Sequence, residues 1–283
     1  MISSIDEEYI LTRAYVPEHI VSLMVSLSKG EPFLVEDHLI FAKDNWLILV
    51  GYPLDGMFLQ ERCEKVLKQT VETFRPEYLW FIGSEIPPSL IDTCKERQTD
   101  RYYRFEIRQT KVKPSLQRTV EKASKELIVE RTHSTSKEHK ELIAELLKRE
   151  ELPPRIKELY RAMPDYVAHS SSVCVLNALN QKGKLCAFYI VDLGAKNFST
   201  YLIGTHSKKY YVPHASDLLF FEMINLTADH GKNTINLGLG VNEGIRRFKE
   251  KWGGVPYLNY EFCERFYGYT RTVSLIKSLE GKL

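Results

Sequence analysis

The chain has 283 residues, of which 43% are hydrophobic and 27% are charged, and its formal net charge at neutral pH is +2. This composition supports a well-packed core and excludes a fibrous or disordered chain, and the length slightly favours two domains over one. The small net charge gives no general reason to expect a nucleic-acid or membrane partner, although local patches are compatible with it.

The first hundred residues alternate between predicted strands and helices. Weak alternation at 5–15 indicates a strand, and helical spacing follows at 16–29. Apolar runs on both sides of a turn at Asp44-Asn45 predict two or three short strands between 33 and 53. The next elements are expected to be a helix, a buried strand, a short helix that begins with proline, and another strand, at 58–74, 78–84, 87–97 and 101–109.

A polar, charged segment at 110–126 marks the expected domain junction, so we predict domains at 1–112 and 113–283. After this segment the pattern predicts a strand at 126–133 and then two helices, at 136–150 and 153–167. Three antiparallel strands should follow, at 173–180, 185–194 and 198–207, with a hairpin turn at 181–184 between the first two.

The stretch from Tyr210 to Tyr260 holds the densest set of signals. Ser216 is a favourable N-cap for a helix over 217–230, which Gly231 should end. A short strand with two glycines is predicted at 233–240. A helix follows whose apolar face is surrounded by basic residues, and spacing alone predicts only an ordinary amphipathic helix there. That apolar face consists of Ile245, Phe248 and Trp252.

Five cysteines are scattered along the chain without a CxxC pair, and we expect them to be reduced thiols. They are Cys63, Cys94, Cys174, Cys186 and Cys263. The first residues include acids where a secretory signal needs a basic start, and no stretch is long enough to span a membrane. We therefore expect a cytoplasmic protein. The eight histidines and the cysteines match no zinc motif, so no metal is expected.

The order of elements after 170 and the run Gly-Ile-Arg-Arg-Phe-Lys-Glu-Lys-Trp-Gly-Gly at 244–254 resemble the GCN5-related N-acetyltransferase (GNAT) superfamily. More narrowly, they resemble the branch with the Fem aminoacyltransferases and the C-terminal domain of phosphatidylglycerol lysyltransferase. The matching residues are Pro213, Ala215, Ser216, Leu219, Glu222, Gly231, Leu237, Gly238, Gly244, Phe248, Lys249, Trp252, Gly253, Gly254 and Pro256.

The resemblance implies an α/β (α+β) fold with two tandem GNAT-like domains, because that branch commonly carries two such units. Each domain should be a mixed, mostly antiparallel twisted sheet flanked by helices, and the N-terminal copy should be degenerate. In such folds the acyl donor lies between two parallel strands that splay apart, here 200–205 and 234–238.

The resemblance also implies a function: transfer of an acyl group, possibly acetyl, from acyl-coenzyme A to an amine or hydroxyl of a small acceptor. Lys249 matches a lysine near the reacting carbonyl, where a cation stabilises the oxyanion. Tyr211 is a candidate acid for the leaving group and His214 a candidate base. The candidate residues for binding the donor are Lys208, Lys209, Ser216, Asn236, Gly238 and Phe248.

Two alternatives stay open on the same fold. The segment 208–216 contains no glycine, unlike the loop that binds the pyrophosphate of coenzyme A in typical GNAT enzymes. A Fem-type aminoacyl-tRNA donor is therefore the first alternative, although no long heptad segment for a tRNA-binding arm is present. A catalytically silent tandem binding module is the second, because a fold does not establish an activity.

Overall fold

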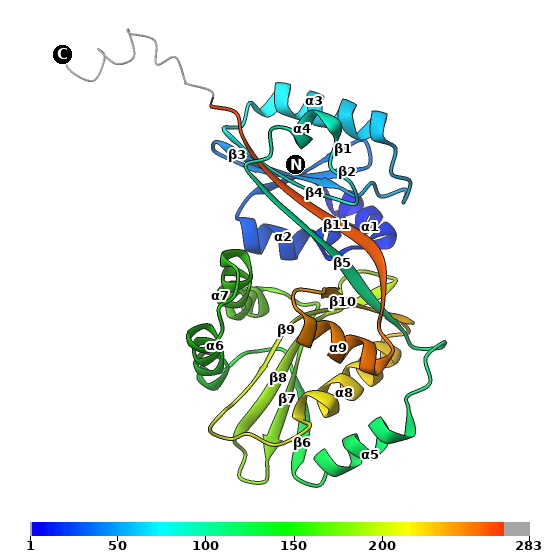
Figure 1. Ribbon diagram of the computed structural model, residues 1–283, viewed down its shortest axis with the longest axis vertical. Helices are drawn as coiled ribbons and strands as arrows, with labels where there is room; N and C mark the ends of the chain where they lie inside the picture. The colour runs from blue at the N-terminus through cyan, green and yellow to red at the C-terminus, as the bar shows by residue number, and fades with distance from the viewer. Residues whose placement is uncertain (1, 269–283) are drawn as a thin grey trace, which may run out of the picture.

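The computed structural model describes residues 2–268, which form a mixed, mostly antiparallel sheet flanked by helices (Figure 1). The strands are β1 Glu31–Val35, β2 His38–Lys43, β3 Trp46–Gly51, β4 Tyr78–Gly83, β5 Glu96–Glu106, β6 Leu127–Thr132, β7 Val173–Asn180, β8 Leu185–Asp192, β9 Phe198–His206, β10 Thr234–Leu239 and β11 Val255–Phe266. The helices are α1 Ser4–Arg13, α2 Val21–Ser28, α3 Gln60–Phe74, α4 Pro88–Ile91, α5 Pro114–Ala123, α6 Lys137–Arg149, α7 Pro154–His169, α8 Ala215–Asp229 and α9 Glu243–Trp252, with a 3-10 turn, η1, at Pro17–His19.

The same order of element types occurs twice along the chain. Strands β1, β2 and β3 are followed by α3, β4, α4 and β5, and strands β7, β8 and β9 by α8, β10, α9 and β11. In each series a helix connects two parallel strands, β3 with β4 and β9 with β10. Apart from the last strand of each series, Figure 1 shows the first series in its upper half and the second in its lower half.

The two halves exchange their last strands. The strands are ordered β1-β2-β3-β4-β11-β5-β10-β9-β8-β7-β6, so β11 pairs with β4 and β5, and β5 pairs with β10. Both strands are long and run from one half to the other (Figure 1). A single sheet therefore continues across the predicted domain boundary.

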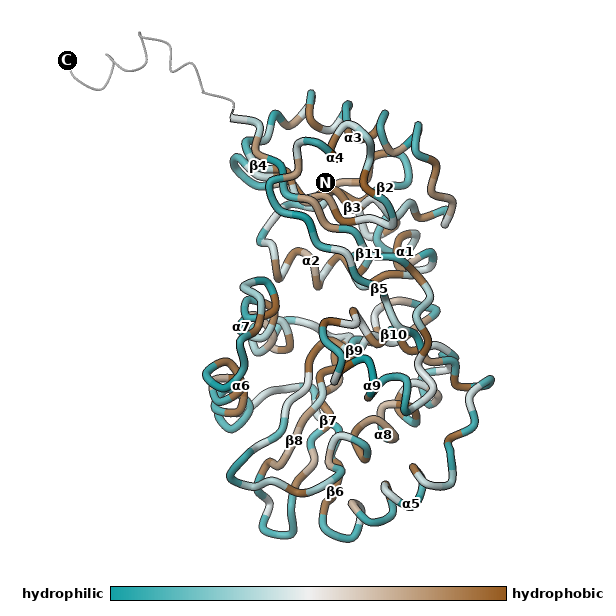
Figure 2. The backbone as a smooth tube through the Cα atoms, viewed as in Figure 1, coloured by the Kyte–Doolittle hydropathy of each residue, from teal (hydrophilic) through white to brown (hydrophobic). Residues whose placement is uncertain are grey.

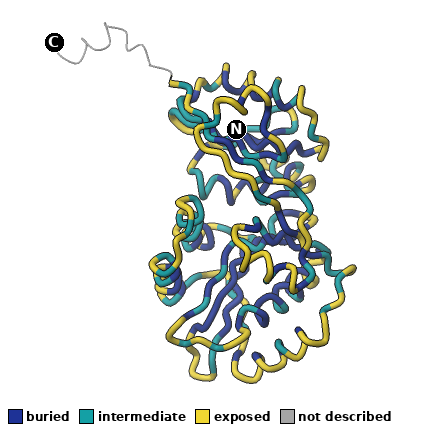
Figure 3. Tube along the Cα trace, viewed as in Figure 1, coloured by how far each residue is buried: buried dark blue, intermediate teal, exposed yellow. Residues whose placement is uncertain are grey.

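Buried side chains form a cluster on each face of each half of the sheet. Leu39 and Phe41 of β2 lie in the cluster under α1 and α2, and Ile40 between them lies in the cluster under α3. This alternation is expected of a strand that is covered on both faces. Figure 2 shows the hydrophobic stretches along the inner strands, and Figure 3 shows the same strands buried.

The prediction of a strand at 5–15 is wrong, because α1 occupies most of this segment. A capping box forms at its start: the Ser3 hydroxyl accepts from the Asp6 amide at 3.2 Å, and the Asp6 carboxylate accepts from the Ser3 amide at 2.9 Å. The helix buries Ile10 completely against the N-terminal half. Local capping thus determines the structure of a segment whose alternation is weak.

The polar segment at 110–126 contains a helix, α5, rather than an extended junction. Its residues Leu116, Val120 and Ala123 recur at helical spacing and are buried in the cluster that includes α8. The single proline, Pro114, begins the helix, where it interrupts no hydrogen bond. No helix within 2–268 is long and apolar enough to cross a membrane. The cytoplasmic location stays a prediction.

The expectation of five reduced thiols is also corrected. Cys94 and Cys263 form a disulfide, whereas the other three cysteines are free and buried. The Lys95 amide donates to the Glu264 carbonyl at 2.7 Å, and this contact places the start of β5 beside β11. The exchange of strands therefore brings together two cysteines that lie far apart in the sequence.

Candidate active site

The parallel strands β9 and β10 pair at their beginnings and then separate. Their register runs from Phe198 opposite Thr234 to Thr200 opposite Asn236, and no later residues pair. The pairing of β9 with β8 shifts register between Tyr201 and Ile203. On the other side, β10 shifts register against β5 before Leu239. Irregularities of this kind bend strands and commonly lie next to functional sites.

A cavity of about 430 Å³ begins where these strands separate. Its wall combines residues of α2, α7 and α9 with both strands, so it lies between the two halves of the molecule. Most of its lining side chains are aliphatic or aromatic. They include Leu23, Met24, Leu27, Leu152, Ile156, Leu159, Tyr160, Tyr189, Leu202, Phe220, Leu237, Ile245 and Phe248. Pockets for small molecules are typically apolar with a few placed polar groups.

Helix α9 carries Lys249 into this wall. The Asn242 side chain caps the helix by accepting from the Ile245 amide at 2.9 Å. The Lys249 side chain is buried, and its Nζ donates to the Leu239 carbonyl at 2.6 Å. Burial lowers the pKa of Lys249 to about 7, although the nearby Asp100 carboxylate opposes the change. A lysine with this pKa is partly charged at neutral pH.

The loop before α9 is held in a strained conformation. Val241 has φ of 56°, a left-handed value that is unfavourable for a β-branched residue. Asp100 of β5 accepts from the amides of Gly240 and Val241, at 3.1 and 2.8 Å. Strain of this kind persists only where its surroundings maintain it, and it often accompanies a functional site.

The start of α8 differs from the prediction. The helix begins at Ala215, with His214 as N-cap at φ of 65°, so Ser216 is not the cap. Asp217 is buried in the first turn, where its carboxylate accepts from Lys251 Nζ at 2.5 Å and from Trp252 Nε1 at 2.9 Å. His214 Nδ1 lies 3.2 Å from the same carboxylate. An internal anion therefore already occupies this helix N-terminus, which otherwise favours a phosphate.

The structure brings some of the predicted site residues together. Lys249, Ser216, Gly238 and Phe248 all line the cavity. Gly238 has φ of 72°, which only glycine adopts without strain. Asn236 is buried and does not line the cavity; its side-chain amide donates to the Tyr257 hydroxyl at 2.9 Å and accepts from the Gly238 amide at 2.8 Å. Asn236 thus shapes the bulge instead of facing the cavity.

The other predicted residues do not line the cavity. Tyr211 is 59% exposed, and its ring packs on His206. His214 is half exposed and is engaged with Asp217, as described above. Lys208 and Lys209 are exposed on the loop that leads into α8. These four residues are therefore exposed at or before the start of α8 and take no part in the cavity wall.

Three polar residues on the cavity wall are not among the predicted site residues: Glu18, and Thr200 and Thr205 of the strand predicted to border the donor. The hydroxyls of both threonines and one carboxyl oxygen of Glu18 are buried without a partner in the part of the chain that the structure describes. Buried polar groups normally have partners, so such atoms in residues beside a cavity call for an explanation. A threonine in a strand and a glutamate in a short turn give no local signal in the sequence.

The corresponding parallel pair of the N-terminal half is closed. Strands β3 and β4 stay paired from Trp46 opposite Tyr78 to Gly51 opposite Gly83. The Phe81 ring fills the space beside both glycines, since a Cβ at Gly51 would lie 2.2 Å from it and one at Gly83 would lie 2.7 Å from it. No gap comparable to that between β9 and β10 therefore opens between these two strands.

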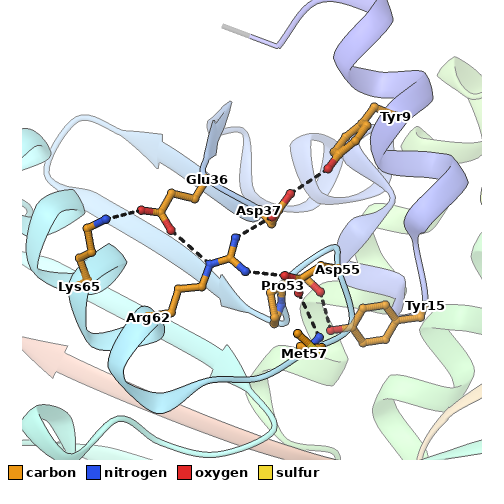
Figure 4. A network of polar contacts seen from close by, with 9 residues as sticks. All are labelled: Tyr9, Tyr15, Glu36, Asp37, Pro53, Asp55, Met57, Arg62 and Lys65. Carbon is orange, nitrogen blue, oxygen red and sulfur yellow. Dashed lines mark hydrogen bonds and ion pairs between the residues drawn. The ribbon is translucent and has the colours of Figure 1, made fainter.

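An ionic network fastens the start of α3 in the same half (Figure 4). Arg62 donates to Asp55 at 2.5 Å, to Asp37 at 2.6 Å and to Glu36 at 3.2 Å. Lys65 lies 2.9 Å from Glu36. Hydrogen bonds from Arg62 hold the pKa of Asp37 below its ordinary value. This network ties α3 to the β1–β2 hairpin and to the loop after β3.

No protein-family model matches the sequence, and a search of curated proteins gives no match. Solved structures do match. The C-terminal domain (DUF2156) of a putative lysylphosphatidylglycerol synthetase from Agrobacterium fabrum has a TM-score of 0.60 and 16% identity, with 92% of each chain covered. FemX has a TM-score of 0.61 and 11% identity, with 90% of this chain and 94% of FemX covered.

A tandem GNAT protein from the clavulanic acid biosynthesis pathway has a TM-score of 0.55 and 11% identity, with 93% of this chain and 94% of that protein covered. Together these matches show that the chain has a GNAT-like fold of the kind found in FemX and in lysylphosphatidylglycerol synthetase. The resemblance inferred from the run at 244–254 is therefore confirmed at the level of the fold.

Proposed function

We propose that this GNAT-like chain is an acyltransferase that moves an acyl group to an amine or hydroxyl of a small acceptor, with the donor held between β9 and β10. One observation carries the proposal. The parallel pair ends at Thr200 opposite Asn236 and opens into a cavity that has a buried lysine, Lys249, in its wall. The reaction is favoured by an apolar site with a cation held in place, and the cavity offers both when Lys249 is protonated.

In the proposed reaction the acceptor attacks the carbonyl carbon of the donor and forms a tetrahedral oxyanion. Lys249 stabilises this oxyanion when its amine is protonated. Because burial lowers its pKa to about 7, the charged fraction decreases as pH rises through 7. The transfer rate should therefore decrease over the same range, provided that the acceptor's own ionisation is accounted for.

Acyl-coenzyme A is the first candidate donor. Its thioester would lie beside Gly238 and Phe248, and its phosphates near the exposed Lys208 and Lys209. Calorimetry with acyl-coenzymes of short, medium and long chain tests this choice, and saturable binding of at least one is expected. Lys249→Met should keep that binding but slow acyl transfer by about 10²- to 10³-fold. Absence of binding across the panel rules out this donor.

An aminoacyl-tRNA ester is the second candidate donor. Two observations favour it: 208–216 contains no glycine, and the carboxylate of Asp217 already occupies the α8 N-terminus. A gel shift that compares aminoacylated with uncharged tRNA across a salt series tests this choice, because backbone-only binding is strongly salt-dependent. If neither donor class binds, the acyltransferase proposal fails. The open cavity favours an enzyme over a silent binding module.

We also propose that the two halves are tandem GNAT-like domains, 1–112 and 113–283, of which 269–283 lie outside the described residues. The repeated order of elements supports this. The N-terminal copy would be degenerate, because its parallel strands stay paired as far as Gly51 opposite Gly83, where the Phe81 ring occupies the space beside both glycines. Activity should then survive Arg62→Met wherever that protein stays folded.

A further inference from the structure

Glu18 is the acidic side chain among the described residues that line the cavity between the two halves. It lies in the short turn η1, which precedes α2. The turn is fixed by the next residue, since the His19 ring is buried with its Nε2 2.8 Å from the Tyr52 carbonyl. The backbone around Glu18 is thus well anchored, and the carboxyl group is held in one place.

The Glu18 carboxyl group is only partly satisfied by protein contacts. The Tyr102 hydroxyl donates to its Oε1 at 2.6 Å, and its Oε2 is buried without a partner within residues 2–268. No basic side chain of this part of the chain lies within 4.0 Å of the carboxyl group, and Lys249 instead donates to the Leu239 carbonyl. A buried carboxylate without a cation is unfavourable unless something else pairs with it.

The charge of Glu18 contributes to the raised pKa of four tyrosines. They are Tyr102 of β5, Tyr257 and Tyr260 of β11, and Tyr52, which directly follows β3. Burial raises the pKa of Glu18 itself, and the hydrogen bond from Tyr102 opposes this. Elsewhere on the cavity wall the ionisable groups are Lys249, His206, Tyr160, Tyr189 and Tyr201.

We propose that Glu18 is the acceptor-binding carboxylate of this cavity, that it pairs with the ammonium group of a primary-amine acceptor with an apolar body, and that it takes a proton from that group. The proposal rests on the acyltransferase function and names the acceptor class. The ammonium group of the acceptor supplies the cation that Glu18 lacks. The aliphatic side chains that line the cavity suit a hydrocarbon body. A hydroxyl acceptor would leave the carboxylate without a counter-charge.

In the proposed transfer the bound ammonium gives one proton to the Glu18 carboxylate, and the resulting neutral amine attacks the donor's carbonyl carbon. A C–N bond forms, and the bond from that carbon to the sulfur or oxygen of the leaving group breaks. The second nitrogen proton ends on the leaving group. The products are an amide, a protonated leaving group and one proton on Glu18, which then passes to solvent.

Binding of two matched probes tests the proposal without any donor. Hexylammonium and 1-hexanol share the same chain and differ in charge, and both are titrated calorimetrically into wild type, Glu18→Gln and Glu61→Gln. Glu61 is an exposed residue of α3 that does not line the cavity. Glu61→Gln therefore changes the net charge by the same amount as Glu18→Gln does, but away from the cavity. Wild type and Glu61→Gln should bind hexylammonium about 10- to 100-fold more tightly than hexanol. Glu18→Gln should lose this preference and keep its affinity for hexanol.

A measurement on wild type alone covers the case in which Glu18→Gln does not fold. At a pH near the raised pKa of Glu18, hexylammonium binding should release a proton, detected in buffers of different ionisation enthalpy, whereas hexanol binding should release none. The proposal is overturned if Glu18→Gln prefers hexylammonium over hexanol as strongly as wild type does, or if wild type binds the two probes equally well. Since these titrations contain no donor, a failure of acyl transfer is separable from a failure of amine recognition.

Discussion

Replacing Lys249 with methionine should make the protein more stable and less active. The ordinary lysine pKa is 10.5 and that of Lys249 is about 7. Between these values the unfolded chain binds a proton that the folded chain does not, so the free energy of unfolding rises with pH. The full difference between the two pKa values corresponds to about 5 kcal/mol of unfolding free energy. The increase between pH 7 and 9.5 accounts for about 3 kcal/mol of this.

Methionine fills nearly the same volume without a charge, and it gives up the hydrogen bond to the Leu239 carbonyl. We therefore expect Lys249→Met to be more stable than wild type by about 2 to 4 kcal/mol at pH 7, and the two proteins to converge toward pH 9.5. Urea denaturation at a series of pH values measures this difference, and taking the difference cancels titrations that both proteins share.

Lys251, two residues further along α9, supplies a matched control with the opposite sign. Its amine pairs with the buried carboxylate of Asp217 at 2.5 Å. Lys251→Met should therefore lower the free energy of unfolding by about 1 to 2 kcal/mol. A Lys249→Met protein that is less stable than wild type at pH 7, or that keeps the full rise in stability between pH 7 and 9.5, would refute this account of the lysine.

The remaining predictions concern the N-terminal half and the disulfide. Burial lowers the pKa of His38 to about 4, so between pH 6.5 and 4 the unfolded chain binds a proton that the folded chain does not. As pH falls over this range, wild type should lose about 3 kcal/mol of unfolding free energy relative to His38→Leu. Urea denaturation at a series of pH values measures this loss. Arg62→Met should lower the free energy of unfolding by about 1 to 3 kcal/mol, because Arg62 pairs with three carboxylates. Lys65→Met removes one exposed ion pair and should change it by less than about 1 kcal/mol. Equal effects of the two variants would contradict this account of the network. Thiol titration of the oxidised, denatured protein should count three thiols, and five would disprove the disulfide. Cys94→Ser should release Cys263 as a titratable thiol and lower the free energy of unfolding by about 2 to 4 kcal/mol.

Segments with strong apolar periodicity were predictable from the sequence. The spacing of apolar residues located β7, β8 and β9 within a residue or two, and the positions of Ile245, Phe248 and Trp252 located α9. The prediction failed where a helix cap or packing against a distant segment determines the secondary structure. At α1 a capping box overrides weak alternation, and at α5 three apolar residues in a charged segment suffice because α8 covers them.

The site was predictable only where a motif marks it. Lys249 stands in the run that resembles GNAT proteins, and the structure places it in the cavity wall. Glu18 carries no such mark, because its role depends on Tyr102, which lies 84 positions along the chain. Tyr211 and His214 have side chains suited to proton transfer, yet neither lines the cavity. Residue type predicts what a side chain can do, and only the fold decides where it does it.

The exchanged strand β11 also has a consequence for synthesis of the chain. Strands β4 and β5 of the N-terminal half leave the ribosome early, but their common neighbour follows roughly 150 residues later, which is about 10 to 30 s at ordinary rates of translation. During this interval both strands present unpaired edges, which promote association with other chains. The first half therefore cannot complete its sheet until β11 has been synthesised.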